Sequence, residues 1–367
     1  MLPYSETFIA AQGLHLPNWK VVFAGATEDR SGLNLLKGAK TCTLTNEVPR
    51  WKRGIAAFAF KRFGSIPALW VERLQTFKPS LIHVHFGPDA LFMGIPLAKA
   101  LGIPLVVTFH GFDITINDPQ SRYQRERGRL FEHASRVIAV SDFIAEQLVK
   151  QGCPIEKIVR HYIGIDLQKF KPIEGYFERK DVVFVGRLTE KKGCRYLIDA
   201  MLKIATESKT NHHLHIIGDG TLKAELELQA RPLGDRVVFH GRQDPDFVRT
   251  MMGRAAVFCA PSVTSRSGDA EGLGMVNLEA MAMRTPVVST FHTAIPEAVI
   301  HEETGILVRE ADSGALAAAL NRCLEQRDFA CELGAKGLIH VRRNFDVRRQ
   351  CAALETIYEA SVNAGVT

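Results

Sequence analysis

Apolar runs rich in β-branched residues alternate with amphipathic stretches along almost the whole chain, and this alternation predicts strands joined by helices. The strands predicted in the first half cover residues 21–24, 81–86, 104–109, 137–140 and 159–163. Those predicted in the second half cover residues 182–185, 213–217, 237–239, 257–260 and 287–289. Short apolar strands with helices between them are typical of parallel sheets buried on both faces, so we expect a doubly wound α/β protein.

The predicted helices fill the spaces between these strands. They cover residues 90–101, 142–150, 194–205, 222–228 and 274–283, and most of 313–360. Ser141 stands directly before one of them, where a side-chain oxygen can cap the first free amides of the helix.

The segment 164–180 has no hydrophobic period and contains Pro172 and Gly175, so we interpret it as a linker. A length of 367 residues suits two domains. We therefore expect one domain over residues 1–163, a second over 181–345, and a last helix over 346–367 that packs back on the first domain. The first domain should open with a buried strand, but the chain begins with a polar segment, so we expect that strand to be absent or to lie upstream.

The composition is that of an ordinary globular protein, with 46% hydrophobic and 23% charged residues. No run approaches the roughly 20 apolar residues of a membrane span, and the N-terminal residues do not resemble a secretory signal. The seven cysteines are scattered and form no C-x-x-C pair, which argues against a zinc site and favours a reducing, cytoplasmic location.

Positive charge is concentrated in the first half of the chain. Residues 1–170 hold 21 Lys and Arg against 14 Asp and Glu, whereas residues 171–367 hold 25 against 26. A basic half indicates a phosphate-bearing partner, which could be nucleic acid, an anionic membrane surface or a phosphorylated substrate. No nucleic-acid-binding motif accompanies the charge, so we expect no nucleic-acid partner.

Two basic stretches, 50–74 and 122–129, suggest contact with an anionic membrane surface. The first mixes cations with aromatic residues and includes Lys52, Arg53, Lys61 and Arg62. The alternative interpretation is that amphipathic helices pack on the sheet and keep their cations in water.

The stretch 267–282 carries the most specific chemistry. Glu271 precedes a predicted helix and Glu279 lies inside it; at 1.5 Å per residue, eight helical residues span roughly 12 Å. The amides of Gly272, Leu273 and Gly274 lie between the two acids and favour a phosphate. This layout fits a nucleotide-sugar, with Glu279 on a ribose diol and Glu271 on the sugar. The alternative is an acidic helix N-terminus that binds no ligand.

Glu271 and Glu279 together resemble the E-x7-E motif of retaining glycosyltransferases with the GT-B fold, especially glycosyltransferase family 4. Residues 185–193 resemble the phosphate motif of that family, 217–220 its second glycine loop and 164–172 its interdomain segment. Segments 5–9, 83–87 and 108–113 resemble a branch that builds bacterial exopolysaccharides.

The resemblance implies the GT-B fold, in which two Rossmann-like domains face each other across a cleft. It implies transfer of a sugar, with retention, from a UDP- or GDP-sugar to a growing, lipid-linked polysaccharide, and we favour UDP. The nucleotide-sugar is then a co-substrate, and we expect neither a cofactor nor a metal ion.

The resemblance also implies roles for individual residues. Arg187 and Lys192 follow a strand end and would neutralise the leaving diphosphate, because Arg offers a fork and Lys a point charge to phosphate. The expected catalytic set adds His110 and Glu271. The expected donor-binding set is Glu279, Gly272, Leu273, Gly274, Gly186, Gly218, Asp219, Gly220 and Arg242. The expected acceptor-side set is Ser5, Glu6, His85 and Asp113.

His83 and the triplet 244–246 have structural interpretations that need no ligand. His83 lies two residues before His85, and we expect the two rings to point in different directions. Asp244 and Asp246 form a D-x-D triplet of the kind that binds metal in another glycosyltransferase fold, but Pro245 favours a helix cap at Asp244.

Two other functions are considered. An oxidoreductase would need G-x-G-x-x-G directly after a strand, and the sequence has none. A non-catalytic scaffold or binding module of a polysaccharide assembly system is the stronger alternative, and it gains weight if the first buried strand is absent and not upstream.

Overall fold

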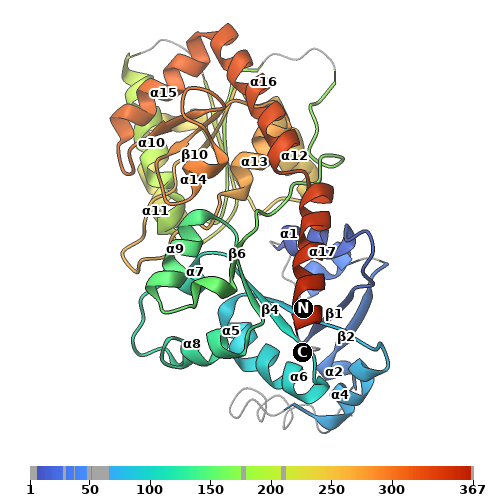
Figure 1. Ribbon diagram of the computed structural model, residues 1–367. Helices are drawn as coiled ribbons and strands as arrows, with labels where there is room; N and C mark the ends of the chain where they lie inside the picture. The colour runs from blue at the N-terminus through green and yellow to red at the C-terminus, as the bar shows by residue number, and fades with distance from the viewer. Residues whose placement is uncertain are drawn as a thin grey trace. The chain divides into compact units, whose positions relative to one another are not determined.

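The computed structural model describes residues 6–27, 30–36, 38–47, 51, 66–174, 179–207 and 212–364 (Figure 1). The chain forms two compact units. The first unit comprises Met1–Gly164 together with Val347–Thr367, and the second comprises Ile165–Asp346. Each unit is built from parallel strands and helices, as the hydrophobic pattern predicts.

The described strands of the first unit form two parallel sheets. β1 (Val22–Gly25) pairs with β2 (Lys40–Thr43). The other sheet has the order β3-β4-β5-β6, with β3 at Ile82–His85, β4 at Leu105–Phe109, β5 at Arg136–Ala139 and β6 at Ile158–Arg160. The strand predicted over 159–163 is therefore shorter than expected. The first described element is a helix, and no backbone hydrogen bond between described residues joins β1 to β3.

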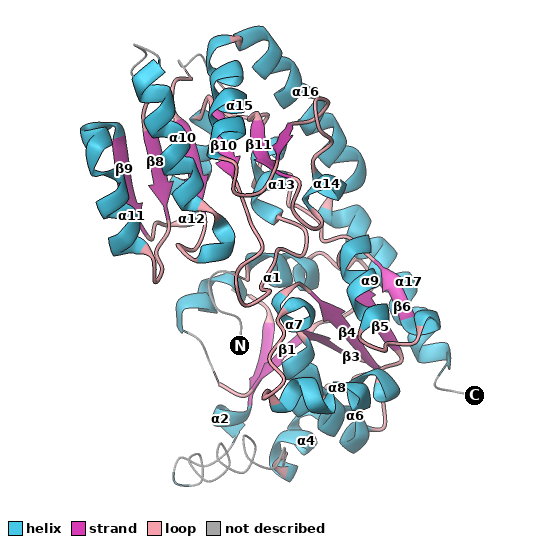
Figure 2. Cartoon of the chain, turned by 90° about the vertical axis from the view of Figure 1, so that its left-hand side faces the viewer, coloured by secondary structure: helices cyan, strands magenta, loops and turns pink. Residues whose placement is uncertain are grey.

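The helices of the first unit cover its sheets (Figure 2). They are α1 (Thr7–Leu14), α2 (Leu44–Glu47), α4 (Ala68–Gln75), α5 (Gly87–Asp89), α6 (Ile95–Leu101), α7 (Phe112–Thr115), α8 (Arg122–His133), α9 (Asp142–Lys150) and α17 (Val347–Ala364). Short 3₁₀ segments cover Arg30–Leu36 and Ile155–Lys157, and a π-helical turn covers Ala90–Gly94. Ser141 caps α9 by accepting a hydrogen bond from the amide of Ile144, as predicted.

The C-terminal helix α17 belongs to the first unit although it follows the second in sequence. Leu354 and Tyr358 pack with Val106 and Ile138 of the four-stranded sheet. The buried carboxylate of Glu355 accepts hydrogen bonds from the amides of Asn18 and Trp19 and from the Asn18 side chain, at 2.7–3.1 Å. These contacts tie the C-terminal helix to the N-terminal part of the chain.

The second unit has one six-stranded parallel sheet with the order β12-β11-β10-β7-β8-β9. Its strands are β7 (Val182–Val185), β8 (Leu214–Ile217), β9 (Val237–Gly241), β10 (Val257–Ala260), β11 (Val287–Thr290) and β12 (Ile306–Val308). Its helices are α10 (Cys194–Glu207), α11 (Lys223–Ala230), α12 (Pro245–Arg254), α13 (Met275–Ala282), α14 (Ile295–Ala298), α15 (Ser313–Glu325) and α16 (Arg327–Asn344). Glu190–Lys192 and Arg231–Arg236 are 3₁₀ segments.

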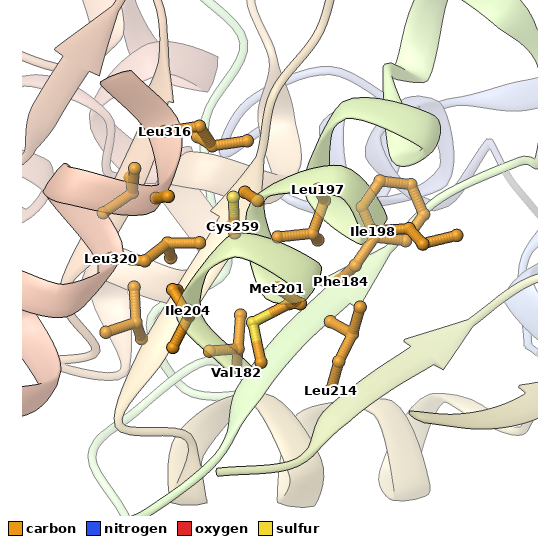
Figure 3. Packing of buried hydrophobic residues seen from close by; sticks show 14 of the residues in the cluster. Val182, Phe184, Leu197, Ile198, Met201, Ile204, Leu214, Cys259, Leu316 and Leu320 are labelled. Carbon is orange, nitrogen blue, oxygen red and sulfur yellow. The ribbon is translucent and has the colours of Figure 1, made fainter. Parts of the chain in front are cut away.

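The main core of the second unit lies between its sheet and the helices α10 and α15. Apolar side chains of α10 interdigitate there with those of β7, β8 and β10 (Figure 3). The labelled members are Val182, Phe184, Leu197, Ile198, Met201, Ile204, Leu214, Cys259, Leu316 and Leu320. This packing holds the strands rigidly and so fixes where their carboxyl ends place the loops.

Candidate functional site

The loops that carry the predicted donor-binding residues lie at one edge of the sheet in the second unit. All its strand pairs are parallel, so every strand presents its carboxyl end on the same side. Gly186 and Arg187 follow β7, Gly218–Gly220 follow β8, Arg242 follows β9, and Glu271 lies in the loop after β10. Ligand sites of open α/β sheets form at this edge.

Lys192 and Glu271 form the central contact of the site. The ammonium of Lys192 lies 2.8 Å from a carboxylate oxygen of Glu271, and their side chains are only 16% and 12% exposed. Gly193, with φ of +64°, allows the chain to turn directly after Lys192. A Cβ atom at Gly193 would lie 1.8 Å from the carbonyl oxygen of Pro261, so only glycine lets these two loops approach so closely.

Glu271 is ionised in this environment. Burial alone would raise the pKa of its carboxyl, but the charges of Lys192 and Lys191 outweigh burial and hold the pKa at about 2. A carboxylate that stays charged at every physiological pH can accept hydrogen bonds from sugar hydroxyls and can stabilise positive charge nearby.

Glu279 has the opposite electrostatic environment. Burial raises the pKa of its carboxyl to about 7, and the charges of Lys192 and Arg249 only partly offset that effect. Helix α13 begins at Met275, so Glu279 is its fifth residue and Glu271 lies before it. The expected separation of roughly 12 Å assumed eight helical residues, but residues 271–274 are not helical, so that derivation does not apply.

The amides between the two acids are available to a ligand. Gly272, Leu273 and Gly274 are buried, and their amides donate no hydrogen bond to the described part of the chain. Gly274 has φ of +74° and stands at the N-terminus of α13, with Ile295 packed closely beside it. Gly274 caps the N-terminus of α13, and Gly272 and Leu273 directly precede it; a helix N-terminus favours an anion.

The glycines after β7 and β8 bring two loops together. The amide of Gly186 donates to the carbonyl oxygen of Ile217, and the amide of Gly218 donates to that of Gly241. A Cβ atom at Gly218 would lie 1.9 Å from the carbonyl oxygen of Gly186, and one at Gly220 would lie 2.5 Å from that of Leu188. These glycines therefore serve close backbone packing at the edge of the sheet.

The remaining candidates of the second unit differ in what they contact. Arg187 is exposed and makes no ion pair with any residue that the structure describes. Asp219 and Arg242 are exposed on loops of the same edge. Lys191, in contrast, is 7% exposed and pairs with Asp269 at 2.8 Å, so it holds the loop after β10 in place.

The candidates of the first unit gather at the carboxyl ends of β3 and β4. Nδ1 of His85 lies 2.9 Å from Nε2 of His110, and the two rings stack with centroids 5.1 Å apart. Burial lowers the pKa of His110 to about 3 and that of His85 well below its usual value, so both are neutral. Nδ1 of His110 is buried and has no partner among the described residues.

Asp113 supports the loop that carries His110. Its carboxylate accepts hydrogen bonds from the amides of His110, Gly111 and Gly87 at 2.9–3.1 Å. Burial raises the pKa of Asp113 to about 6 despite these bonds. Glu6 precedes α1, whose Phe8 ring lies 5.1 Å from that of His110, and Ser5 lies outside the described residues.

The structure corrects the expectation for His83. Its ring lies 4.4 Å from that of His85, because residues two apart in a strand point to the same face. His83 contacts Thr108 through Nε2 and Tyr358 of α17 through Nδ1, both at 2.6 Å. His83 thus links the histidine cluster to the C-terminal helix.

Sequence reasoning missed two residues that contact Glu271. His292 and Thr293 follow β11, and both bond to the backbone of Glu271. The signal was present, since polar residues directly after a parallel strand share the edge where the site forms.

The D-x-D triplet forms a helix cap, as predicted. The carboxylate of Asp244 accepts from the amides of Asp246 and Phe247 at 2.9 and 3.0 Å. Within the described ranges, no group of three or more His, Cys, Asp or Glu side chains could hold a metal ion. Among these same residues, no helix is both long and apolar enough to cross a membrane.

Comparison with known proteins identifies two family matches. Residues 20–169 match the family described as Glycosyltransferase Family 4, and residues 179–326 match Glycosyl transferases group 1. A putative colanic acid biosynthesis glycosyltransferase of Escherichia coli is 33% identical over 302 residues, which cover 77% of this chain and 73% of that protein. The amylovoran biosynthesis glycosyltransferase AmsK of Erwinia amylovora is 32% identical over 279 residues, covering 73% and 68%.

Solved structures share the fold. The crystal structure of Anabaena HepE in complex with UDP and glucose superposes with a TM-score of 0.78 at 21% identity, covering 97% of this chain and 96% of that one. A lipopolysaccharide outer core galactosyltransferase, WaaB, superposes with a TM-score of 0.65 at 20% identity, covering 97% and 95%.

Proposed function

This chain belongs to glycosyltransferase family 4 and has the GT-B fold, and from that premise we propose its chemistry. It is a glycosyltransferase of the exopolysaccharide type that takes its sugar from a nucleotide-sugar. We propose that the donor is a UDP-sugar, that transfer retains the anomeric configuration without a metal ion, and that the acceptor is a growing lipid-linked polysaccharide.

The ion pair between Lys192 and Glu271 carries this proposal. It joins a cation to an ionised carboxylate at the carboxyl edge of a parallel sheet, beside the amides of Gly272–Gly274, which donate to no described residue. An ammonium has three N–H donors, so Lys192 can contact Glu271 and a phosphate oxygen together. The donor diphosphate would then lie on the amides, with its sugar toward Glu271 and its ribose toward Glu279.

In the proposed reaction, the bond between the anomeric carbon and the diphosphate oxygen breaks first. Arg187, Lys192 and the amides stabilise the negative charge that develops on the departing diphosphate. The negative charge of Glu271 stabilises the oxocarbenium-like sugar. The acceptor hydroxyl attacks from the side that the diphosphate leaves, and a phosphate oxygen takes its proton, so the configuration is retained.

His110 would contact the sugar as a neutral group in this scheme. Burial keeps the pKa of His110 at about 3, so it offers hydrogen bonds rather than positive charge. Glu6 and His85 lie in the same unit as His110 and would face the acceptor, as would Ser5.

UDP is favoured as the carrier because HepE, which shares the fold, has been solved with UDP and with UDP-glucose. A lipid-linked acceptor would bring the enzyme to the cytoplasmic face of the membrane. Helix α8 supports that location with the exposed cations Arg122, Arg125 and Arg129, although Glu126 pairs with two of them. In the other basic stretch, 50–74, the cations Lys52, Arg53, Lys61 and Arg62 lie outside the described residues.

A panel of UDP- and GDP-sugars tests the proposal by thermal shift and by turnover. A true donor should raise the melting temperature by mass action and should be hydrolysed or transferred, whereas Glu271→Ala should bind UDP but turn over little. A wild-type chain that binds nucleotide-sugars without any turnover would favour the scaffold function. Flotation with anionic vesicles, with and without Arg125→Gln, tests the membrane part.

A further inference from the structure

The backbone of Glu271 is held on both sides by two consecutive residues. Its amide donates a hydrogen bond to Nε2 of His292 at 3.1 Å, and its carbonyl oxygen accepts one from the hydroxyl of Thr293 at 2.8 Å. The His292 side chain has no exposed surface. Both polar backbone atoms of one acidic residue are therefore bound by the loop that follows β11.

These contacts determine the tautomer of His292. Because Nε2 accepts from an amide, it carries no proton, and the ring proton must be on Nδ1. Nδ1 lies 2.7 Å from Oε1 of Glu310, so its N–H can donate a hydrogen bond to that carboxylate oxygen. A carboxylate that accepts a hydrogen bond from one ring nitrogen of a histidine fixes both the tautomer and the orientation of the imidazole.

Glu310 also holds the other end of the loop that carries Glu271. Its second oxygen, Oε2, accepts a hydrogen bond from the amide of Thr264 at 2.8 Å. Thr264 follows β10 closely, and Glu271 ends the same loop before α13. One carboxylate from the segment after β12 thus fixes the start of the loop directly and its end through His292.

Backbone strain at Thr293 indicates that the arrangement is specifically maintained. Thr293 has φ of +43°, a strained conformation that a β-branched residue rarely adopts. Such strain persists only where the surroundings over-determine the backbone. Here the strained turn brings two adjacent side chains onto the backbone N–H and C=O of one residue, Glu271.

We propose that His292, Thr293 and Glu310 are positioning residues that aim the Glu271 carboxylate. None of them needs to touch the donor. They hold the backbone of Glu271, whose side chain lies 2.8 Å from the ammonium of Lys192. The inference rests on the proposed function, in which Glu271 faces the transferred sugar.

Three variants separate positioning from simple folding support. His292→Gln can place its Oε1 near the position of Nε2 and still accept from the Glu271 amide, whereas His292→Leu cannot accept. Glu310→Gln keeps the size of the side chain but can satisfy only one of its two N–H donors. Glu302→Gln removes a carboxylate that pairs with Arg322 on the surface of the same unit and serves as the control.

We expect His292→Leu to lower kcat with a UDP-sugar about 100-fold, as a small misplacement of a reacting group does. His292→Gln should retain kcat within about 10-fold, and Glu310→Gln should lie between them. The Kd for UDP alone should not change, because UDP lacks the sugar that Glu271 contacts. The control should match the wild type.

Wild-type kcat in His292→Leu and Glu310→Gln would overturn the inference while the proposed function stands. So would a loss of UDP affinity and melting temperature that parallels the loss of kcat, because that pattern indicates general destabilisation. If the wild type turns over no donor, the proposed function fails, and amide hydrogen exchange measured by NMR still decides the inference. The Glu271 amide should be protected in the wild type and in His292→Gln and should exchange faster in His292→Leu; equal exchange rates would overturn it.

Discussion

The ammonium of Lys192 lies 2.8 Å from the carboxylate of Glu271, although the two residues follow different strands of the sheet. Both side chains are largely buried, so each charge depends on the other for its stability. The pair adjoins Gly272–Gly274, whose amides donate to no described residue, just before the N-terminus of α13.

Breaking the pair should impair both stability and turnover. Glu271→Gln leaves the Lys192 charge unpaired, so we expect a loss of roughly 1–3 kcal/mol in the free energy of unfolding at pH 7. We expect kcat to fall about 100-fold or more, because an electrostatic contact to the transition state is removed. Calorimetry and donor turnover measure the two effects.

The pH dependence of the same pair has a definite sign. The folded-state pKa of Glu271 is about 2, below its ordinary value of 4.5, so its stabilisation is complete above pH 4.5 and is lost as the pH falls toward 2. Glu225→Gln is the control for Glu271→Gln. It breaks an exposed pair with Arg195 and should change the free energy of unfolding by less than about 1 kcal/mol. An equal loss of stability in Glu271→Gln and Glu225→Gln would contradict the central role of the buried pair.

Glu279→Gln should stabilise the protein and weaken nucleotide binding. The folded-state pKa of Glu279 is about 7, above its ordinary value of 4.5, so stability falls as the pH rises from 4.5 to about 7 and stays lower above it. At pH 8 the neutral Gln should gain roughly 1–3 kcal/mol, with little gain at pH 5. Thermal unfolding with and without UDP measures both effects, and unchanged UDP affinity would argue against a contact with the ribose.

Lys191 and Lys192 should have separable roles. Asp269→Asn leaves the buried Lys191 charge without its carboxylate, so we expect a loss of roughly 1–3 kcal/mol in stability. Lys192→Met should instead weaken UDP binding about 10-fold or more, because a charge-assisted contact to phosphate is lost. Isothermal titration with UDP distinguishes them; an Asp269→Asn protein that is stable but binds no UDP would reverse the assignment.

Gly218→Ala should disrupt the edge that carries the site. Its Cβ atom would lie 1.9 Å from the carbonyl oxygen of Gly186, at φ of +140°, so backbone must move and we expect a loss of about 3 kcal/mol or more. Gly241→Ala is the matched control. It also has a positive φ, of +63°, but no atom lies within 4 Å of its Cβ position, so about 1 kcal/mol is expected. Calorimetry of both variants tests the difference.

The first unit should lose stability in weak acid. Burial lowers the pKa of His110 to about 3 and that of His161 to about 4, and it lowers the pKa values of His83 and His85 well below 6.5. Below pH 6.5 the unfolded chain therefore takes up protons that the folded chain does not bind. Each of these histidines should cost about 2 kcal/mol by pH 5.

Tryptophan fluorescence can follow this unit alone, because Trp19, Trp51 and Trp70 all belong to it. Urea titrations at pH 7.5 and 5.5 should show the loss. His110→Asn should reduce the difference between the two pH values, whereas replacing the exposed His133 by Asn should not. A difference unchanged by His110→Asn would mean that His110 is protonated in the folded protein.

Much of the fold was predictable because it depends on local hydrophobic pattern. The strands predicted at 182–185 and 257–260 coincide with β7 and β10. Ser141 caps α9 and Asp244 caps α12, as predicted. Parallel strands bring their carboxyl ends together, so the sequence also indicated which loops share an edge. The helix predicted over 90–101 differs, since a π-helical turn opens it where Gly94 packs closely on Val84.

Hydrophobic pattern and motifs were enough to predict most of the strands, the family, and the acidic and cationic residues at the sheet edge, although β2 and β12 were not predicted. The tertiary structure was needed to show that Lys192 pairs with Glu271 while Lys191 pairs with Asp269. It was also needed to show that His292, supported by Glu310, accepts a hydrogen bond from the Glu271 amide. It alone decided that Glu271 is ionised and that the pKa of Glu279 rises to about 7. The reason is physical: a hydrophobic period is a property of neighbours in sequence, whereas burial and charge pairing depend on residues that only folding brings together.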